Sequence, residues 1–266
     1  MSDSTLPPIG IGTYDVAPDD CREAVRDALD DGYRHVDTAE MYENESAVGD
    51  AIDAADVARD EVFVSTKTHS TNLADGDLLE HARRSRDRLG VETIDLLYVH
   101  WPIRSYDPEA TLAAMDRLHD EGLIRHVGLS NFTPELLEAA LDRLDAPLYA
   151  HQIECHPLLP QTELRELARE HGHYLVAYSP LAKGQVFDVP ELVEIADRHD
   201  ATAAQVSLAW LLSKERVRVI PKSTSRAHIR ENRRARGLQL TDEEIRTIDE
   251  LDERVRQVDF PEAPWN

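Results

Sequence analysis

Four side chains that can take part in proton transfer stand at comparable places in this sequence. Asp37, Lys67 and His100 each follow directly on a short strand-like run, and Tyr42 lies just past Asp37. The carboxyl ends of successive strands meet at one face of a (β/α)8 barrel, and enzymes of this fold build their active sites there. An acid, a phenol, an amine and an imidazole at these positions therefore predict one shared site.

The four residue types suit a reaction at a carbonyl group. A phenol has an ordinary pKa near ~10 and is a weak acid at neutral pH. Lys67 beside Tyr42 would lower the pKa of that phenol, and Asp37 would keep Lys67 charged. His100 would hydrogen-bond the same substrate oxygen. A general acid next to an oxygen-binding site is suited to carbonyl reduction.

Each of the four residues also has a purely structural interpretation. Asp37 could cap a helix, and Lys67 could form an ion pair at the barrel rim. Tyr42 could be a packed aromatic, and His100 could be a hydrogen-bonded core histidine. The functional interpretation rests on their joint occurrence at strand ends.

Short apolar runs and amphipathic stretches alternate along the chain. The runs predict eight buried parallel strands, at Ile9–Gly12, Tyr33–Val36, Val62–Thr66, Ile94–Val99, Ile124–Leu129, Leu148–Ile153, Tyr174–Tyr178 and Arg216–Ile220. Apolar residues at helical spacing predict helices over Asp19–Asp30, Glu45–Ala54, Asp77–Leu89, Pro108–Asp120, Pro134–Leu144, Glu163–His171 and Arg226–Ala235. Alternation of this kind favours a (β/α)8 TIM barrel over an open sheet.

Two further stretches exceed one helix per strand. Ala203–Ser213 and Asp242–Leu251 are expected to be extra helices, the second starting after a cap at Thr241. Thr133 and Pro134 form another predicted helix start. Since no linker, repeat or low-complexity tract interrupts the sequence, residues 1–266 are expected to form a single domain.

The charge of the chain restricts its partners and suggests its origin. The net charge is −23, which argues against nucleic-acid binding because phosphate attraction needs a basic face. The four lysines are Lys67, Lys183, Lys214 and Lys222, and arginine supplies the other basic side chains. An acidic, lysine-poor surface is typical of proteins from a salt-rich cytoplasm, where ions screen the repulsion between carboxylates. We therefore expect a halophilic protein.

Several other classes of protein find no support in the sequence. The first residues lack the basic and apolar regions of a signal peptide, and no segment has the length of a membrane span, so a cytoplasmic protein is expected. Cys21 and Cys155 form no metal-ligand spacing, and we expect no metal site. Gly10 and Gly12 begin like a dinucleotide fingerprint without its third glycine, and there is neither a P-loop nor an HExxH motif.

Five segments, in order along nearly the whole chain, resemble the aldo-keto reductase family. They are Asp37–Glu45 followed by Val48-Gly49, His100–Pro102, Gly128–Phe132, Gln152–Pro157 and Ile220–Thr224. The short loops are similar to those of the prokaryotic 2,5-diketo-D-gluconate reductases. The resemblance implies an oxidoreductase that reduces aldehydes or ketones with NADP(H) bound across the carboxyl ends of the strands.

The resemblance also implies roles for individual residues. Asp37, Tyr42, Lys67 and His100 match the catalytic set, with Tyr42 as general acid, and Tyr14 and Trp101 match substrate-pocket positions. The positions that match cofactor contacts are Ser130, Asn131, Gln152, Tyr178, Ser179, Leu181, Lys183, Lys222, Ser223, Thr224, His228, Glu231 and Asn232.

The chain departs from the family at two of these regions. His228 stands where NADP-preferring members have an arginine, so NAD(H) is also a candidate cofactor, and Arg226 is a candidate substitute for that arginine. A histidine is mostly neutral at pH 7 and pairs weakly with a phosphate. His151 replaces an asparagine, and the sequence offers no physical account of it.

Two alternatives to a reductase remain open at this stage. One is a nicotinamide-binding regulatory subunit, similar to the β subunits of potassium channels. The other is a barrel aldolase with Lys67 as Schiff-base lysine. For the reductase we expect a small-molecule carbonyl substrate, an open site with Trp265 folding over it, and a monomer or weak dimer.

Overall fold

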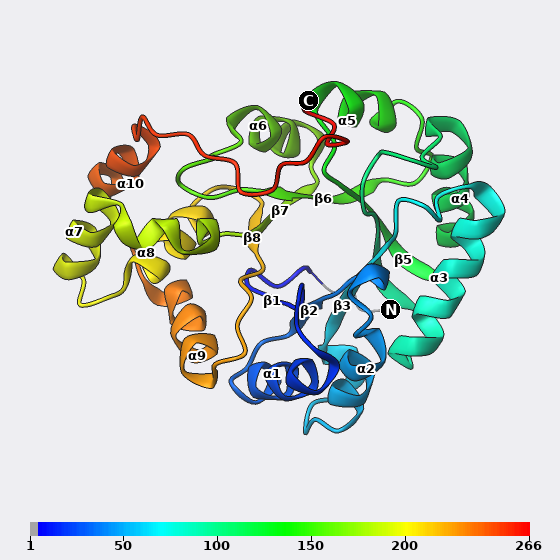
Figure 1. Cartoon of the computed structure of the whole chain (residues 1–266), viewed down its shortest axis with the longest axis horizontal. Helices are drawn as coiled ribbons and strands as arrows, with labels where there is room; N and C mark the ends of the chain where they lie inside the picture. Colours follow the sequence, from blue (N-terminus) through cyan, green and yellow to red (C-terminus); the bar gives the residue numbers. More distant parts are fainter. Residues whose placement is uncertain (1–4) are drawn as a thin grey trace.

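Eight parallel strands form one sheet in the computed structural model, which describes residues 5–266 (Figure 1). Neighbouring strands along the chain pair with each other, and parallel bridges from Ile9 to Val219 and from Gly12 to Lys222 join the first strand to the last. The strands are β1 Ile11–Gly12, β2 His35–Asp37, β3 Phe63–Thr68, β4 Ile94–Val99, β5 Ile124–Ser130, β6 Leu148–Glu154, β7 Tyr174–Tyr178 and β8 Val217–Val219. The predicted (β/α)8 barrel is confirmed.

Helices surround the sheet (Figure 1). The α-helices are α1 Pro18–Asp30, α2 Glu45–Asp53, α3 Asp75–Leu89, α4 Pro108–Asp120, α5 Pro134–Leu141, α6 Thr162–His171, α7 Pro190–Arg198, α8 Ala203–Leu212, α9 Arg226–Arg234 and α10 Asp242–Asp249. Short 3-10 helices are η1 Glu40–Tyr42, η2 Arg59–Glu61, η3 Ala182–Asp188 and η4 Ala235–Gly237. The β7–β8 connection holds both α7 and α8, and α10 follows α9, so two helices exceed one per strand.

Helix α7 was not expected from the sequence. Its signals are nevertheless present, with Pro190 in the first turn and Leu192, Ile195 and Ala196 forming one buried face. The helix is short and directly follows the irregular turn η3, so its apolar pattern was not recognised in the sequence.

The expected helix starts are confirmed by their hydrogen bonds. The Thr133 hydroxyl accepts the Leu136 N–H, with Pro134 in the first turn of α5. Thr241 and Glu244 form a reciprocal capping box at the start of α10. These caps satisfy N–H groups that a helix start leaves without an intrahelical partner.

The barrel has one core between sheet and helices and a smaller one inside the sheet. The inner core contains Leu6, Phe63, Leu96, Tyr98, Ala150, Val176 and Ile220. At the seam between the first and last strands, a Cβ on Gly12 would lie 2.9 Å from the Ile220 carbonyl oxygen. Glycine at this position therefore lets the two strands approach closely enough to close the barrel.

The C-terminal segment returns from α10 across the barrel and ends near α5 (Figure 1). The buried Glu154 carboxylate at the end of β6 accepts the backbone N–H groups of Gln257 and Val258, at 2.6 and 2.9 Å. This anchor holds the segment over the carboxyl ends of the strands. Within residues 5–266, no helix has the length and apolar character needed to cross a bilayer.

Candidate active site

Asp37 and Lys67 form a buried ion pair at the ends of β2 and β3. The Lys67 Nζ donates to Asp37 Oδ1 at 2.5 Å and to the Thr38 carbonyl at 2.7 Å. Burial lowers the pKa of Lys67 below its usual value, and the Asp37 carboxylate opposes that shift. The pair is almost completely buried, so each charge depends on the other for compensation.

Tyr42 lies beside this pair, on the 3-10 turn η1. The Lys67 Nζ is 3.4 Å from the Tyr42 hydroxyl and 4.9 Å from the centre of its ring. The expected lowering of the phenol pKa by Lys67 is wrong for this arrangement. Burial raises the pKa of Tyr42 well above its usual value, and the Asp37 charge acts in the same direction. Tyr42 is therefore protonated at neutral pH.

His100 completes the set at the end of β4. Its ring centre is 5.8 Å from that of Tyr42, with the ring planes at 76°. Burial holds the pKa of His100 well below its usual range, and the charges of Lys67 and His69 act in the same direction. The Nδ1 of His100 is buried without a hydrogen-bond partner among the described residues. The side chain is thus a neutral imidazole at pH 7, able to donate one N–H.

The Asp37 carboxylate joins this set to two further side chains. Its Oδ2 accepts from the Ser65 hydroxyl at 2.8 Å and from the Gln152 Nε2 at 2.9 Å. Behind Ser65, the His35 ring lies 2.9 Å from the hydroxyl, and burial lowers the pKa of His35 to about 4. Both oxygens of the Asp37 carboxylate therefore accept hydrogen bonds, which fix its orientation.

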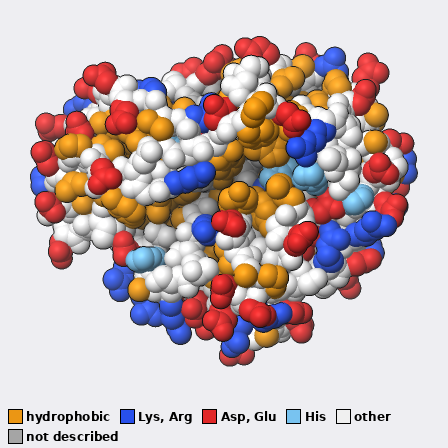
Figure 2. All heavy atoms as spheres, viewed as in Figure 1, with side chains coloured by type: hydrophobic (Ala, Val, Ile, Leu, Met, Phe, Trp, Pro, Cys, Tyr) orange, Lys and Arg blue, Asp and Glu red, His pale blue; other side chains and the backbone are white. Residues whose placement is uncertain are grey.

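A cleft of about 940 Å³ opens over these residues. Figure 2 shows this face hollowed at its centre, with hydrophobic side chains in the hollow and many acidic side chains around the outer edge. The predicted site residues that line the cleft are Tyr14, Asp37, Tyr42, His100, Trp101, Ser130, Asn131, Gln152, Tyr178, Ser179, Leu181, Lys183, Lys222 and His228. The volume of the cleft lies near the upper end of the range of about 300–1,000 Å³ that is usual for small-molecule sites.

Other predicted site residues do not line the cleft. Lys67 lies behind its wall, fully buried, which disfavours a Schiff-base role. The Glu231 carboxylate accepts from the Thr202 hydroxyl at 2.7 Å, and Asn232 is buried. Ser223 and Thr224 are likewise absent from the lining residues.

The amide of Asn131 is fixed by its neighbours. Its Nδ2 donates to the His100 carbonyl at 2.9 Å and to the Ser130 hydroxyl at 3.0 Å, and its Oδ1 accepts from the Tyr178 hydroxyl at 2.8 Å. Its φ of 64° is left-handed, a conformation that asparagine adopts more readily than most residues. These hydrogen bonds connect Asn131 to His100, Ser130 and Tyr178, which are all predicted site residues.

His151 has a structural role that the sequence did not reveal. Its Nε2 lies 3.2 Å from the backbone N–H of Phe132 and accepts a hydrogen bond from it. Burial lowers the pKa of His151 to about 3, so the ring is neutral and free to accept. The ring thus fixes the turn immediately after Asn131.

The loop after β7 has an unusual backbone. Ser179, Ala182, Lys183 and Gly184 all have positive φ, between 46° and 100°. Residues other than glycine adopt this region at a cost, and such conformations cluster at ligand sites. The Lys183 Nζ donates to the Gln257 carbonyl at 3.2 Å, so the loop is tied to the C-terminal segment.

The far end of the cleft lies at the start of α9. Lys222 and His228 line it, while Ser225 caps the helix by accepting the His228 N–H. Arg226, the candidate substitute for an arginine at 228, lies 3.5 Å from Asp27 instead and is absent from the lining. The positive charge at this end therefore comes from Lys222.

Aromatic residues form the near end of the cleft. Tyr14 is 57 % exposed and contacts the Tyr42 ring edge-on, with centres 5.2 Å apart. Trp101 contacts Phe260 at 4.9 Å and Trp265 at 5.6 Å, both from the C-terminal segment. Phe260 rather than Trp265 is among the lining residues. Phe260 was not predicted from the sequence. It could have been suspected because it is a second aromatic residue in the same C-terminal segment as Trp265.

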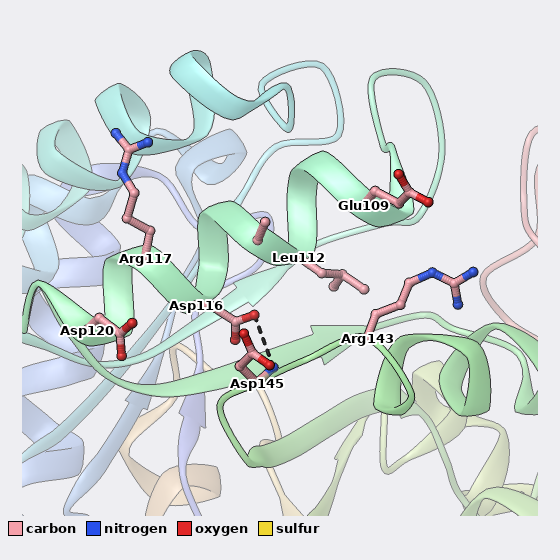
Figure 3. Close-up of a pocket in the computed structure, with 8 residues that line it drawn as sticks. Glu109, Leu112, Asp116, Arg117, Asp120, Arg143 and Asp145 are labelled. Carbon is pink, nitrogen blue, oxygen red and sulfur yellow. Dashed lines mark hydrogen bonds between the residues drawn. The ribbon is translucent and has the colours of Figure 1, made fainter.

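A second, smaller depression lies on the outside of the barrel (Figure 3). It measures about 390 Å³ and lies between α4 and the segment before β6. Asp116 accepts the backbone N–H groups of Asp145 and Ala146, at 3.1 and 2.9 Å. Its carboxylate therefore has a structural task, and no residue of the depression belongs to the predicted site.

Comparison with known proteins gives one consistent result. The model of the aldo/keto reductase family matches residues 8–253. An aldo-keto reductase of Mycobacterium sp. (strain JLS) is 37% identical over 258 residues, covering 95% of this chain and 92% of the relative. Methylglyoxal reductase DkgB of Escherichia coli O157:H7 is 37% identical over 250 residues, covering 93% of each chain.

A solved structure shares the same arrangement. It is assigned provisionally as a 2,5-diketo-D-gluconic acid reductase B and superposes with a TM-score of 0.94 at 35% sequence identity. The match covers 97% of this chain and 92% of that chain.

Proposed function

The chain belongs to the aldo/keto reductase family, and we propose that it reduces aldehydes or ketones to alcohols with NADPH as the preferred hydride donor. The observation that carries the proposal is the placement of the Tyr42 hydroxyl 3.4 Å from Lys67, at the floor of a cleft that His100 also lines.

The cleft suits a nicotinamide dinucleotide in its volume of about 940 Å³ and in its polar lining groups. One end holds Tyr42 and His100, and the other holds Lys222 and His228. The buried Nδ1 of His100 has no partner among the described residues. A bound reduced nicotinamide would supply the hydride, while the Asn131 amide and Tyr178, already connected by a hydrogen bond, would border its ring.

The protein residues would manage the proton and the developing charge. As hydride adds to the carbonyl carbon, the carbonyl π electrons move to oxygen and Tyr42 donates its proton to that oxygen. The phenolate left on Tyr42 is stabilised by Lys67, whose charge is compensated by Asp37. His100, neutral at pH 7, donates a hydrogen bond to the same carbonyl oxygen and orients it.

Cofactor preference follows from the two residues at the far end of the cleft. Lys222 supplies an ammonium to pair with a 2′-phosphate, which favours NADPH. His228 presents an imidazole where NADP-preferring members have a guanidinium, and Arg226 is directed to Asp27. We therefore propose that NADPH is preferred and that NADH is also used.

The aromatic end of the cleft favours a small carbonyl substrate. Tyr14, Trp101 and Phe260 present ring surfaces beside Tyr42. The Escherichia coli relative is a methylglyoxal reductase, which supports a small aldehyde or ketone for this chain.

The test is NADPH oxidation, followed by absorbance in concentrated potassium chloride, with a panel of aldehydes, ketones and keto-sugars and a parallel series with NADH. Substrate-dependent oxidation that is lost in Tyr42→Phe is the expected result. Tight NADPH binding without turnover in either direction would overturn the proposal in favour of a regulatory subunit.

A further inference from the structure

Glu40 places a carboxylate in a hydrogen-bonded network next to the proposed active site, and this carboxylate has no part in the proposed reaction. Its Oε2 accepts the backbone N–H of His69 at 3.0 Å. The Asn72 Nδ2 lies 3.2 Å from both carboxylate oxygens. The Nδ1 of His81 donates to the Oε1. One side chain thus satisfies donors from three other residues.

The network joins three segments that are separate in the sequence. Glu40 begins the 3-10 turn η1, which ends at Tyr42. His69 and Asn72 belong to the loop between β3 and α3, and His81 lies on α3. Since His69 and Ser70 line the cleft, the carboxylate ties the turn that carries Tyr42 to the adjacent wall of the cleft.

The charge of Glu40 is stabilised by these partners. Its side chain is 12% exposed and that of His81 is 22% exposed. Burial acts to raise the pKa of Glu40, but the donors from His69, His81 and Asn72 outweigh it and the pKa is lowered. An ionised carboxylate at this depth would be costly without such donors, so its hydrogen bonds order the loop around it.

Tyr42 has few other contacts that fix its hydroxyl. Among the described residues, its hydroxyl is hydrogen-bonded only by Lys67, over a long 3.4 Å. Its ring meets Tyr14 and His100 through edges. The position of the hydroxyl therefore depends on the backbone of η1, and η1 is attached to the β3–α3 loop through the Glu40 carboxylate.

We propose that Glu40, held by His81, is a positioning residue that sets the place of the Tyr42 hydroxyl relative to a bound carbonyl oxygen. This inference rests on the proposed function. Proton transfer needs a donor within about 3 Å of its acceptor, and displacements of about 1 Å can cost roughly 100-fold in rate. Releasing Glu40 should slow the proton step and leave cofactor binding at the far end of the cleft intact.

The test compares Glu40→Ala, Glu40→Gln and His81→Gln with Glu43→Gln. Glu43 lies just beyond Tyr42, is exposed, and its side chain accepts no hydrogen bond from any residue of 5–266, so it controls for loss of one negative charge. For each variant, kcat, KM, the NADPH dissociation constant from fluorescence, the solvent isotope effect on kcat and the melting temperature are measured.

We expect Glu40→Ala to lower kcat about 10- to 100-fold, as a displacement of the Tyr42 hydroxyl by up to about 1 Å would do. NADPH affinity should change less than about 2-fold, and the solvent isotope effect should rise because proton transfer becomes slower. Glu40→Gln keeps one acceptor oxygen, so its kcat should lie between those of Glu40→Ala and the unaltered protein. His81→Gln should have a kcat similar to that of Glu40→Gln. Glu43→Gln should match the unaltered protein.

Unchanged kcat in Glu40→Ala, or a loss no larger than that in Glu43→Gln, would overturn the inference. So would a loss of kcat with an unaltered isotope effect and an equal loss of NADPH affinity, which would indicate general loosening. If Glu40→Ala does not fold, Glu40→Gln and His81→Gln decide by the same criteria. An inactive unaltered protein would instead overturn the proposed function.

Discussion

The Gln152 Nε2 donates to Asp37 Oδ2 at 2.9 Å, while Lys67 donates to the other oxygen of the same carboxylate at 2.5 Å. One buried carboxylate therefore contacts both Lys67, beside the proposed general acid Tyr42, and a position predicted to contact the cofactor. A change at Asp37 should affect both sides, and a change at Tyr42 should affect only one.

Tyr42→Phe removes the proposed proton donor without removing its ring. We expect kcat to fall by about 100- to 10,000-fold, the usual contribution of a positioned general acid. NADPH affinity, measured by fluorescence, should stay within about 2-fold of that of the unaltered protein because the aromatic ring at position 42 keeps its packing. Weaker NADPH binding with an unchanged rate would contradict the acid role.

Asp37→Asn should act through Lys67, which would keep a buried charge without compensation. Breaking a buried ion pair costs about 3–5 kcal/mol, so the free energy of unfolding measured with denaturant should fall by about that amount. Since the phenolate on Tyr42 would lose support, kcat should fall more than cofactor affinity. Ser65→Ala is the matched control, because it removes one donor to Asp37 and leaves the ion pair. Equal effects of the two variants would refute the role given to the charge.

His228→Arg should increase the preference for NADPH over NADH by roughly 10-fold, equivalent to about 1.4 kcal/mol. The new guanidinium would face the end of the cleft that Lys222 lines. The matched control is Arg226→Gln, whose side chain points to Asp27 and should leave the ratio unchanged. The ratio of kcat/KM for the two cofactors decides, and an unchanged ratio in His228→Arg would show that this residue lies away from the 2′-phosphate.

The pH dependence of carbonyl reduction should reflect the shifted groups. Since the pKa of His100 is held well below 6.5 by burial, the ring stays neutral as pH falls from 8 to 6. Since burial raises the pKa of Tyr42 above 10, the donor stays protonated over the same range. We expect kcat to be flat between about pH 6 and pH 8. An inflection near 6.5 that disappears in His100→Gln would show an ordinary histidine pKa.

Glu154→Gln should release the C-terminal segment that carries Phe260. The amide would present N–H groups to backbone N–H groups of Gln257 and Val258, so at least one hydrogen bond is lost. We expect a substrate KM raised about 5- to 10-fold and faster proteolytic cleavage of the segment. Gln257→Ala is the control, because it removes a side-chain contact to Gln185 and keeps the backbone anchor. Identical proteolysis of the two variants would locate the anchor elsewhere.

The barrel, and the proximity of the four proposed catalytic side chains, could be predicted because their signals are local. Parallel strands buried on both faces give short apolar runs, and residues directly after them must meet at one face of the barrel. Asp37, Lys67 and His100 could therefore be placed together from sequence. The missed helix α7 shows the limit of this reasoning, since its apolar face is short and an irregular turn precedes it.

The fold, the family and the identity of the four central side chains could be inferred from the amino-acid sequence alone. The partners of those side chains became apparent only in the folded chain. Glu154 meets Gln257 across about a hundred residues of chain, and Glu40 meets His81 from another element. Such contacts depend on loop paths and side-chain rotamers, which no local periodicity encodes. The direction of the pKa shift at Tyr42 also required the structure, because burial of the side chain, reinforced by the Asp37 charge, raises that pKa.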